Sequence, residues 1–154
     1  MDRILDNART GPLYLRQPEL AAIVVEAIRY RQQDLKHYQL HAYVVMANHV
    51  HLLITPHVEV SRLMQSLKRF TAREGNRMLG QTGQPFWQDE SYDRLVRDDT
   101  EFQRIVRYIE MNPVKAGLVA MPEDFSWSSA GPIDNRPQAA SLPYNVEQTA
   151  AYSR

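Results

Sequence analysis

The chain has no cysteine, no long apolar run and no net charge, and each absence excludes a class of protein. Without cysteine among its 154 residues, neither disulfides nor thiolate metal sites can form. No apolar stretch approaches the length of a membrane span, and the N-terminal sequence MDRILDNARTG lacks the apolar core of a signal peptide. We therefore expect no membrane partner and a location in a reducing cytoplasm.

The charge balance limits how the protein could bind a polyanion. The 18 Lys and Arg residues equal the 18 Asp and Glu residues in number. Because a dedicated nucleic-acid-binding protein is usually basic, any binding surface here must arise from local segregation of charge. The hydrophobic fraction of 44% and charged fraction of 23% are those of a globular chain of about one domain.

The hydrophobic pattern predicts an α+β fold. Apolar residues at helical spacing predict helices over residues 19–33, 58–79 and 100–112, the last ending because Pro113 follows. β-branched and aromatic runs predict strands over residues 37–46, 49–55 and 92–97. We expect an antiparallel sheet with helices on one face within a domain of residues 1–130. Residues 131–154, rich in Pro, Asn, Gln and Ala, are expected to form a loosely ordered tail.

The stretch NHVHLLIT carries two histidines one residue apart in an apolar strand. Successive side chains of a strand alternate in direction, so His49 and His51 point the same way and can share one metal ion. The less favoured alternative is that both are half-exposed sheet residues without a function. A structural zinc site would need four protein ligands, and the spacing of the other histidines matches no zinc pattern.

The helix expected over residues 100–112 supplies further candidate groups. Tyr108 lies beside the stripe of this helix that is expected to be buried, with Asn112 one turn further on. That stripe consists of Phe102, Ile105, Val106 and Ile109. A tyrosine can act as a covalent nucleophile, and an amide oxygen can ligate a metal ion. Taken alone, each residue fits an ordinary structural role. Their conjunction with the histidine pair favours a metal-assisted site.

The motifs together resemble those of one protein family. The stretch HAYVVMANHVHLLITP resembles the His–hydrophobic–His strand of the single-tyrosine HUH transposases, the insertion-sequence-200-like group. The segments PFWQDESYDRLVRD and RYIEMNPVKAGLVAMPEDFSWSSA resemble those of its subgroup, the REP-associated tyrosine transposases. The similarity extends over about residues 13–130.

The resemblance implies a fold, an activity and a set of roles. It implies a ferredoxin-like or RRM-like sheet, a Mg²⁺ or Mn²⁺ ion, and cleavage and rejoining of single-stranded DNA, often at hairpin-forming repeats. His49 and His51 match the metal-binding pair, Asn112 the third ligand and Tyr108 the nucleophile. Members of the family occur as monomers and as homodimers, and both states stay open.

The N-terminal region departs from the family pattern. Members usually begin with a strand beside the histidine strand, whereas residues 1–16 are polar and broken by Gly11-Pro12. Either the chain starts upstream of Met1, or this part of the gene has decayed, or another chain completes the sheet edge. A catalytically inactive DNA-binding remnant or a domesticated repeat-binding protein is therefore the alternative function. A plasmid relaxase or a replication initiator is a third, but relaxases usually have a three-histidine cluster and an early tyrosine.

Basic residues on two predicted helices are candidate DNA contacts through phosphate neutralisation. They are Lys68, Arg69, Arg73 and Arg77 on one helix and Arg104, Arg107 and Lys115 around the predicted nucleophile. A solvated helix face explains any one of them equally well. Phe86 and Trp87 could stack on unpaired bases, although we expect at least one of them in the core.

Overall fold

The computed structural model describes residues 13–87, 92–131 and 150–153. Its elements in chain order are η1 (Tyr14–Arg16), α1 (Pro18–Gln33), β1 (Tyr38–Val45), β2 (Val50–Pro56), α2 (Val60–Leu79), β3 (Tyr92–Leu95), α3 (Asp99–Lys115), η2 (Pro122–Asp124) and β4 (Ala150–Ser153). The fold is α+β, as the pattern predicted, and no helix among the described residues is long and apolar enough to cross a bilayer.

The strands form a four-stranded antiparallel sheet in the order β1-β2-β4-β3. β1 and β2 form an antiparallel hairpin, with Tyr43 opposite Leu52 and Val44 opposite His51. The pairing shifts between Leu40 and Ala42, so an extra residue bulges from β1. Because the bulge inverts the alternation, Leu40 and Ala42 face opposite sides of the sheet.

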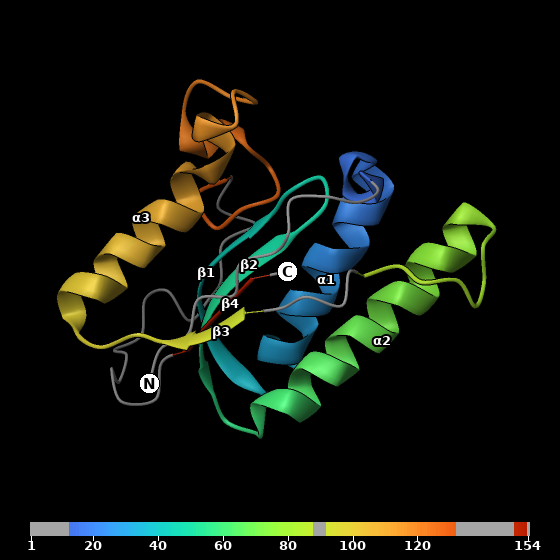
Figure 1. Cartoon of the computed structure of the whole chain (residues 1–154), viewed down its shortest axis with the longest axis horizontal. Coiled ribbons are helices and arrows are strands. Elements are labelled where there is room, and N and C mark those ends of the chain that lie inside the picture. The colour runs from blue at the N-terminus through green and yellow to red at the C-terminus, as the bar shows by residue number, and fades with distance from the viewer. Residues whose placement is uncertain (1–12, 88–91, 132–149, 154) are drawn as a thin grey trace.

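Helices cover both faces of this sheet (Figure 1). The expectation of helices on one face holds for α1 and α2, which bury Tyr43, Leu52 and Ile54 beneath them. α3 packs on the opposite face, where Phe102, Ile105 and Ile109 contact the side chains of Ala42, Val44 and Leu53. The sheet is therefore the middle layer of three, and β2 buries side chains on both of its faces.

Local signals explain where the helices begin and end. Pro18 occupies the first turn of α1, where its missing N–H costs nothing. α2 stops at Gly80, whose φ of +67° is the left-handed conformation that glycine adopts without strain. α3 begins after Asp98, whose Oδ1 accepts a 2.8 Å hydrogen bond from the Glu101 N–H and so caps the helix.

Close packing of the loop after α2 depends on Gly75. A Cβ at this position would lie 2.6 Å from Cε2 of Phe86. The Phe86 ring is buried, stacks on Tyr14 with centroids 5.4 Å apart and meets Trp87 edge to face. Phe86 is thus the member of the pair Phe86 and Trp87 that lies in the core, as expected for at least one of them. Trp87 packs partly buried against the same core and donates its indole N–H to Thr71 Oγ1.

Two departures concern the end of α3 and the end of the chain. The prediction that α3 ends near Asn112 is wrong, because the helix continues through Pro113 to Lys115. Proline removes one backbone hydrogen bond, but Pro113 stands near the end of the helix and buries its ring. The expectation of a loosely ordered tail fails for Ala150–Ser153, which form β4 between β2 and β3.

β4 also bears on the missing first strand. The resemblance placed a strand from the start of the chain beside the histidine strand, and here β4 pairs there, with Ser153 opposite His51. Most of the N-terminal region in question, residues 1–12, lies outside the described residues, as do residues 132–149 of the expected tail. Within the described part, residues 14–16 form the short 3₁₀ helix η1.

Candidate active site

The histidine pair lies beneath α3. His51 is opposite Val44 in the hairpin, and Val44 belongs to the core under α3, so the histidine face is the α3 face. The two imidazole centroids are 4.7 Å apart with their planes at 83°. His49 is 8% exposed and His51 2% exposed, which contradicts the alternative of half-exposed sheet residues. The pair shares one face, as the alternation predicted, but that face is covered.

Tyr108 of α3 lies against this pair. The centroids of its ring and the His51 ring are 5.5 Å apart, at 77°. Phe102, Ile105 and Ile109 hold α3 on the sheet, and the helical period then turns Tyr108 toward the histidines. Tyr108 and His51 are distant along the chain, yet their rings lie side by side.

Asn112 follows Tyr108 by one turn within α3. Residues four apart share a helix face, so the continuation of α3 past Asn112 keeps its amide on the Tyr108 side. In the described part of the chain, no three His, Cys, Asp or Glu side chains gather as a metal site. A divalent ion here would accordingly need the amide oxygen besides the two imidazoles.

The donor set fits such an ion, because the tautomer of His49 is fixed. Its Nδ1 lies 2.8 Å from Asn48 Oδ1, and an amide oxygen only accepts, so Nδ1 carries the proton. The ring lone pair is then on Nε2, the nitrogen remote from Asn48. Oriented imidazoles of this kind are typical of metal ligands. Asn48 was not among the predicted site residues, although its place directly before His49 was a usable signal.

A hydrogen-bonded link ties α3 to the sheet near Tyr108. Ser129 donates its hydroxyl to Glu110 Oε2 at 2.7 Å, and its backbone N–H donates to the Tyr43 carbonyl at 2.9 Å. Glu110 lies two residues after Tyr108, so this link restrains the helix where it carries the phenol. The partners are 19 and 86 residues apart along the chain, and no local pattern signals their contact.

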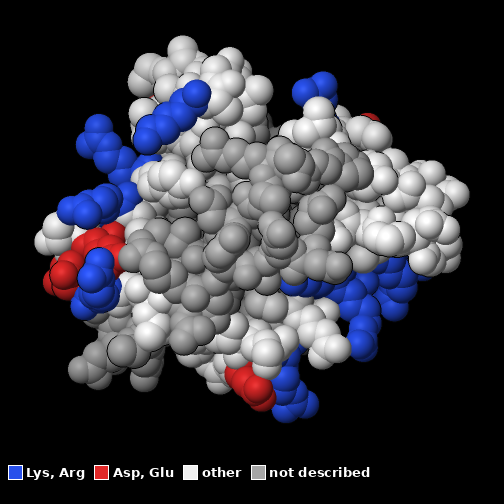
Figure 2. Space-filling model, viewed as in Figure 1, with Lys and Arg blue, Asp and Glu red and all other residues white. Residues whose placement is uncertain are grey.

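The predicted DNA-contacting residues fall into two separate groups. Arg104 and Arg107 are exposed on α3, and Lys115 places its ammonium 5.9 Å from the centroid of the Tyr108 ring. The α2 group lies on the other side of the sheet, with Arg69, Arg73 and Arg77 exposed and Lys68 half-buried. Figure 2 shows basic side chains over α3 on the left and below α2 on the right. The structure thus brings only the α3 group close to the histidine pair.

Comparison with known proteins assigns the family. Residues 16–112 match the family described as Transposase IS200 like, and this match covers more than half of the chain. The chain therefore belongs to the IS200-like transposase family, as its motifs suggested.

Particular relatives narrow the likeness to one subgroup. The REP-associated tyrosine transposase of Escherichia coli (strain K12) is 28% identical over 129 residues, 81% of this chain and 71% of that protein. The solved structure of the REP-associated tyrosine transposase bound to a REP hairpin matches with a TM-score of 0.59 and 20% identity. That match covers 94% of this chain and 79% of the other. At this identity the structural match demonstrates a shared fold.

Proposed function

We propose that this protein cleaves and rejoins single-stranded DNA through a covalent bond between Tyr108 and a 5′-phosphate. The observation that carries the proposal is the packing of the Tyr108 ring 5.5 Å from His51, whose ring is 4.7 Å from that of His49. Membership of the IS200-like transposase family supports the same activity. Because all these side chains belong to one chain, the proposal does not require a second copy.

The reaction is a transesterification. The Oη of Tyr108 attacks the phosphorus of a phosphodiester, a P–Oη bond forms, and the bond from phosphorus to the 3′-oxygen breaks. The phenolic proton is lost and the departing 3′-oxygen gains one, so no nucleotide cofactor is consumed. Attack by a 3′-hydroxyl on the phosphotyrosine reverses the step and rejoins strands.

His49, His51 and Asn112 would hold the divalent ion, Mg²⁺ or Mn²⁺. When bound, such an ion supplies positive charge beside a phosphoryl oxygen, where negative charge accumulates during transfer. The residues of α3 supply the rest. Lys115 adds a cation close to the phenol, and Arg104 and Arg107 offer phosphate contacts on the exposed side of the helix.

For the substrate we propose hairpin-forming repeat DNA of the bacterial cytoplasm. The solved relative is bound to a REP hairpin, and the matching E. coli protein is a REP-associated transposase. Such DNA offers a folded stem beside an unpaired strand, and only the unpaired strand lets a phosphodiester enter a site recessed between α3 and the sheet.

Replacing Tyr108 by phenylalanine tests the proposal. The substitution removes the nucleophilic oxygen and keeps the ring that packs on His51. The protein is incubated with Mn²⁺ and end-labelled, hairpin-flanked single-stranded DNA, then run on a denaturing gel. We expect a protein–DNA band from the parent chain, no such band from Tyr108→Phe, and similar DNA affinity in both. An adduct that persists in Tyr108→Phe contradicts the role of Tyr108, and binding by the parent without any adduct favours the non-catalytic alternative.

A further inference from the structure

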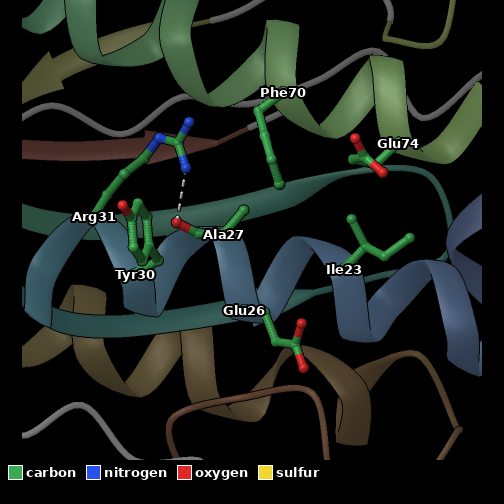
Figure 3. Close-up of a pocket in the computed structure, with 7 residues that line it drawn as sticks. All are labelled: Ile23, Glu26, Ala27, Tyr30, Arg31, Phe70 and Glu74. Atoms are coloured by element: carbon green, nitrogen blue, oxygen red, sulfur yellow. Dashed lines mark hydrogen bonds between the residues drawn. The ribbon is translucent and has the colours of Figure 1, made fainter. Parts of the chain in front are cut away.

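A groove runs between α1 and α2, on the sheet face opposite Tyr108. It consists of two adjoining pockets of about 510 Å³ and about 330 Å³, which share Arg31 of α1 and Phe70 of α2. Figure 3 shows Phe70 reaching from α2 toward α1, with Arg31 beside it and Tyr30 below Arg31. Pockets of several hundred Å³ are of the size that holds small ligands.

Arg31 is the most unusual residue of the groove. It is 5% exposed, donates from Nη1 to the Ala27 carbonyl at 3.2 Å and from Nη2 to the carbonyl and hydroxyl of Ser66, both at 3.1 Å. Its Nε has no hydrogen-bond partner, and no carboxylate in the described part of the chain pairs with it. Burial lowers the pKa of Arg31, because a guanidinium loses hydration there. A buried cation without a counter-ion is the place where an anionic ligand gains most.

The smaller pocket surrounds this cation with others. Arg62, Arg69 and Arg73 of α2 line it together with Arg31, and no carboxylate is among its lining residues. Arg73 also pairs with Glu74 at 3.5 Å, but the Glu74 side chain lines the larger pocket. Planar guanidinium groups match phosphate oxygens in geometry and charge. The smaller pocket is therefore complementary to a phosphate group.

The larger pocket has a different chemistry. Its walls are mainly apolar and aromatic, with Ile23, Tyr30 and Phe70 around it and the carboxylates of Glu26 and Glu74 at its margin. Tyr30 is 51% exposed, so its ring is open to a ligand. Flat aromatic surfaces stack on nucleobases, and carboxylates accept hydrogen bonds from exocyclic amines of bases. This pocket is complementary to a base.

We propose that the groove between α1 and α2 binds one nucleotide of an unpaired DNA strand, with its base against Phe70 and Tyr30 and its phosphate on Arg31, Arg62 and Arg69. The inference rests on the proposed function in one respect, because that function supplies single-stranded DNA as the substrate. The groove and Tyr108 are on opposite faces of the sheet, so the nucleotide in the groove is remote from the one that reacts. The groove would thus hold a flanking part of the substrate during cleavage.

Binding variants test the groove apart from catalysis. All are made on Tyr108→Phe, so that no adduct interferes, and anisotropy of a labelled single-stranded oligonucleotide is measured at several salt concentrations. Arg69→Gln should weaken binding and reduce the slope of log affinity against log salt by about 0.7, the value for one lost phosphate contact. Phe70→Leu should weaken binding about fivefold or more with the slope unchanged, because it removes a stacking surface. Arg16→Gln, at an exposed arginine of η1, is the matched charge control and should change neither.

Two outcomes would overturn the inference. One is that both groove variants bind DNA with the affinity and salt slope of the parent. If Phe70→Leu lowers the melting temperature, the result for Arg69→Gln alone decides. The other is saturation of the groove by free deoxyadenosine monophosphate at the same concentration at which the oligonucleotide saturates it. The groove would then be a site for free nucleotides. Failure of the catalytic proposal gives a different result. The parent chain then forms no covalent adduct with DNA, while the binding differences between the groove variants remain.

Discussion

His41 is the extra residue of the bulge in β1, and its environment makes the stability of the protein depend on pH. Its Nε2 lies 2.6 Å from Thr55 Oγ1, and its ring meets Phe102 edge to face at 5.2 Å. Burial lowers the pKa of His41 to about 4, because the imidazolium would lose its hydration among these groups. The folded protein therefore keeps His41 neutral well below the pH at which an unfolded chain protonates it.

Because of His41, the protein should become less stable as the pH falls. The unfolded-state pKa of histidine is about 6.5, so between about pH 6.5 and about pH 4 only the unfolded chain gains this proton. The free energy of unfolding should fall through that window, by about 2 kcal/mol at pH 5 from this residue. Urea denaturation at pH 7.5 and pH 5 should show a larger loss in the parent than in His41→Gln. Equal losses would contradict the account.

Some residues of the site could be predicted from the sequence and others could not. The common face of His49 and His51 follows from strand alternation, and the place of Tyr108 follows from the helical period, which are both local properties. The burial of His49 and His51 depends on which face of the sheet α3 packs against, and this is not a local property. The Ser129–Glu110 link and the unpartnered Nε of Arg31 depend on long-range packing, which leaves no mark in a local pattern.

Among the helices and strands, too, some could be predicted from the sequence and others could not. α1 and α2 match their predicted spans closely, because each carries an apolar stripe, and α2 also ends at a glycine, Gly80. α3 ran past its expected end, since the general effect of proline on a preceding residue was outweighed by burial of Pro113. β4 was missed because four residues without a hydrophobic signal become a strand only when neighbours on both sides pair with them.

The N-terminus of α3 offers a prediction at the scale of one element. Asp98 caps the helix through the Glu101 N–H, and Glu101 Oε2 in turn accepts from the Arg97 backbone N–H at 3.0 Å. Asp98→Ala should lower the free energy of unfolding by about 1 kcal/mol, as loss of a cap does. Asp98→Asn keeps a capping oxygen and should remain close to the parent. Urea denaturation of the three proteins measures this, and equal losses in both variants would show that the charge of Asp98 matters and the cap does not.

At the scale of the whole molecule, the sheet depends on a strand from the far end of the described chain. β4 lies between β2 and β3 and pairs with both, so it joins the hairpin to the strand that leads into α3. Without β4, one edge of β2 and one edge of β3 would present unpaired backbone groups. The strand that follows His49 would then lie at the margin of the sheet.

A shortened chain tests this arrangement. Ending the chain at residue 149 should speed amide hydrogen exchange in β2 and β3 and leave α1 and α2 near their parental protection. Removal of Arg154 alone is the control, because β4 ends at Ser153. Unchanged exchange in β2 and β3 would mean that β4 contributes nothing to the sheet in solution.

The arrangement of charge belongs to the whole molecule as well. The net charge is zero, yet arginines gather on the outer side of α2 and basic residues also follow α3, with the sheet between them. Local segregation of this kind gives two surfaces for a polyanion without an excess of basic residues. A DNA substrate with a hairpin stem and a flanking single strand could contact both the α2 surface and the α3 surface.

The central claim is that Tyr108 forms the covalent bond to DNA, and peptide mapping tests it most directly. The protein is incubated with Mn²⁺ and hairpin-flanked single-stranded DNA, then digested with nuclease and trypsin. Cleavage after Arg107 and Lys115 releases YIEMNPVK, in which Tyr108 is the tyrosine. The account predicts that this peptide carries the mass of a residual 5′-phosphorylated nucleotide, with the fragment ions locating it on Tyr108. A nucleotide attached to any other peptide would contradict it.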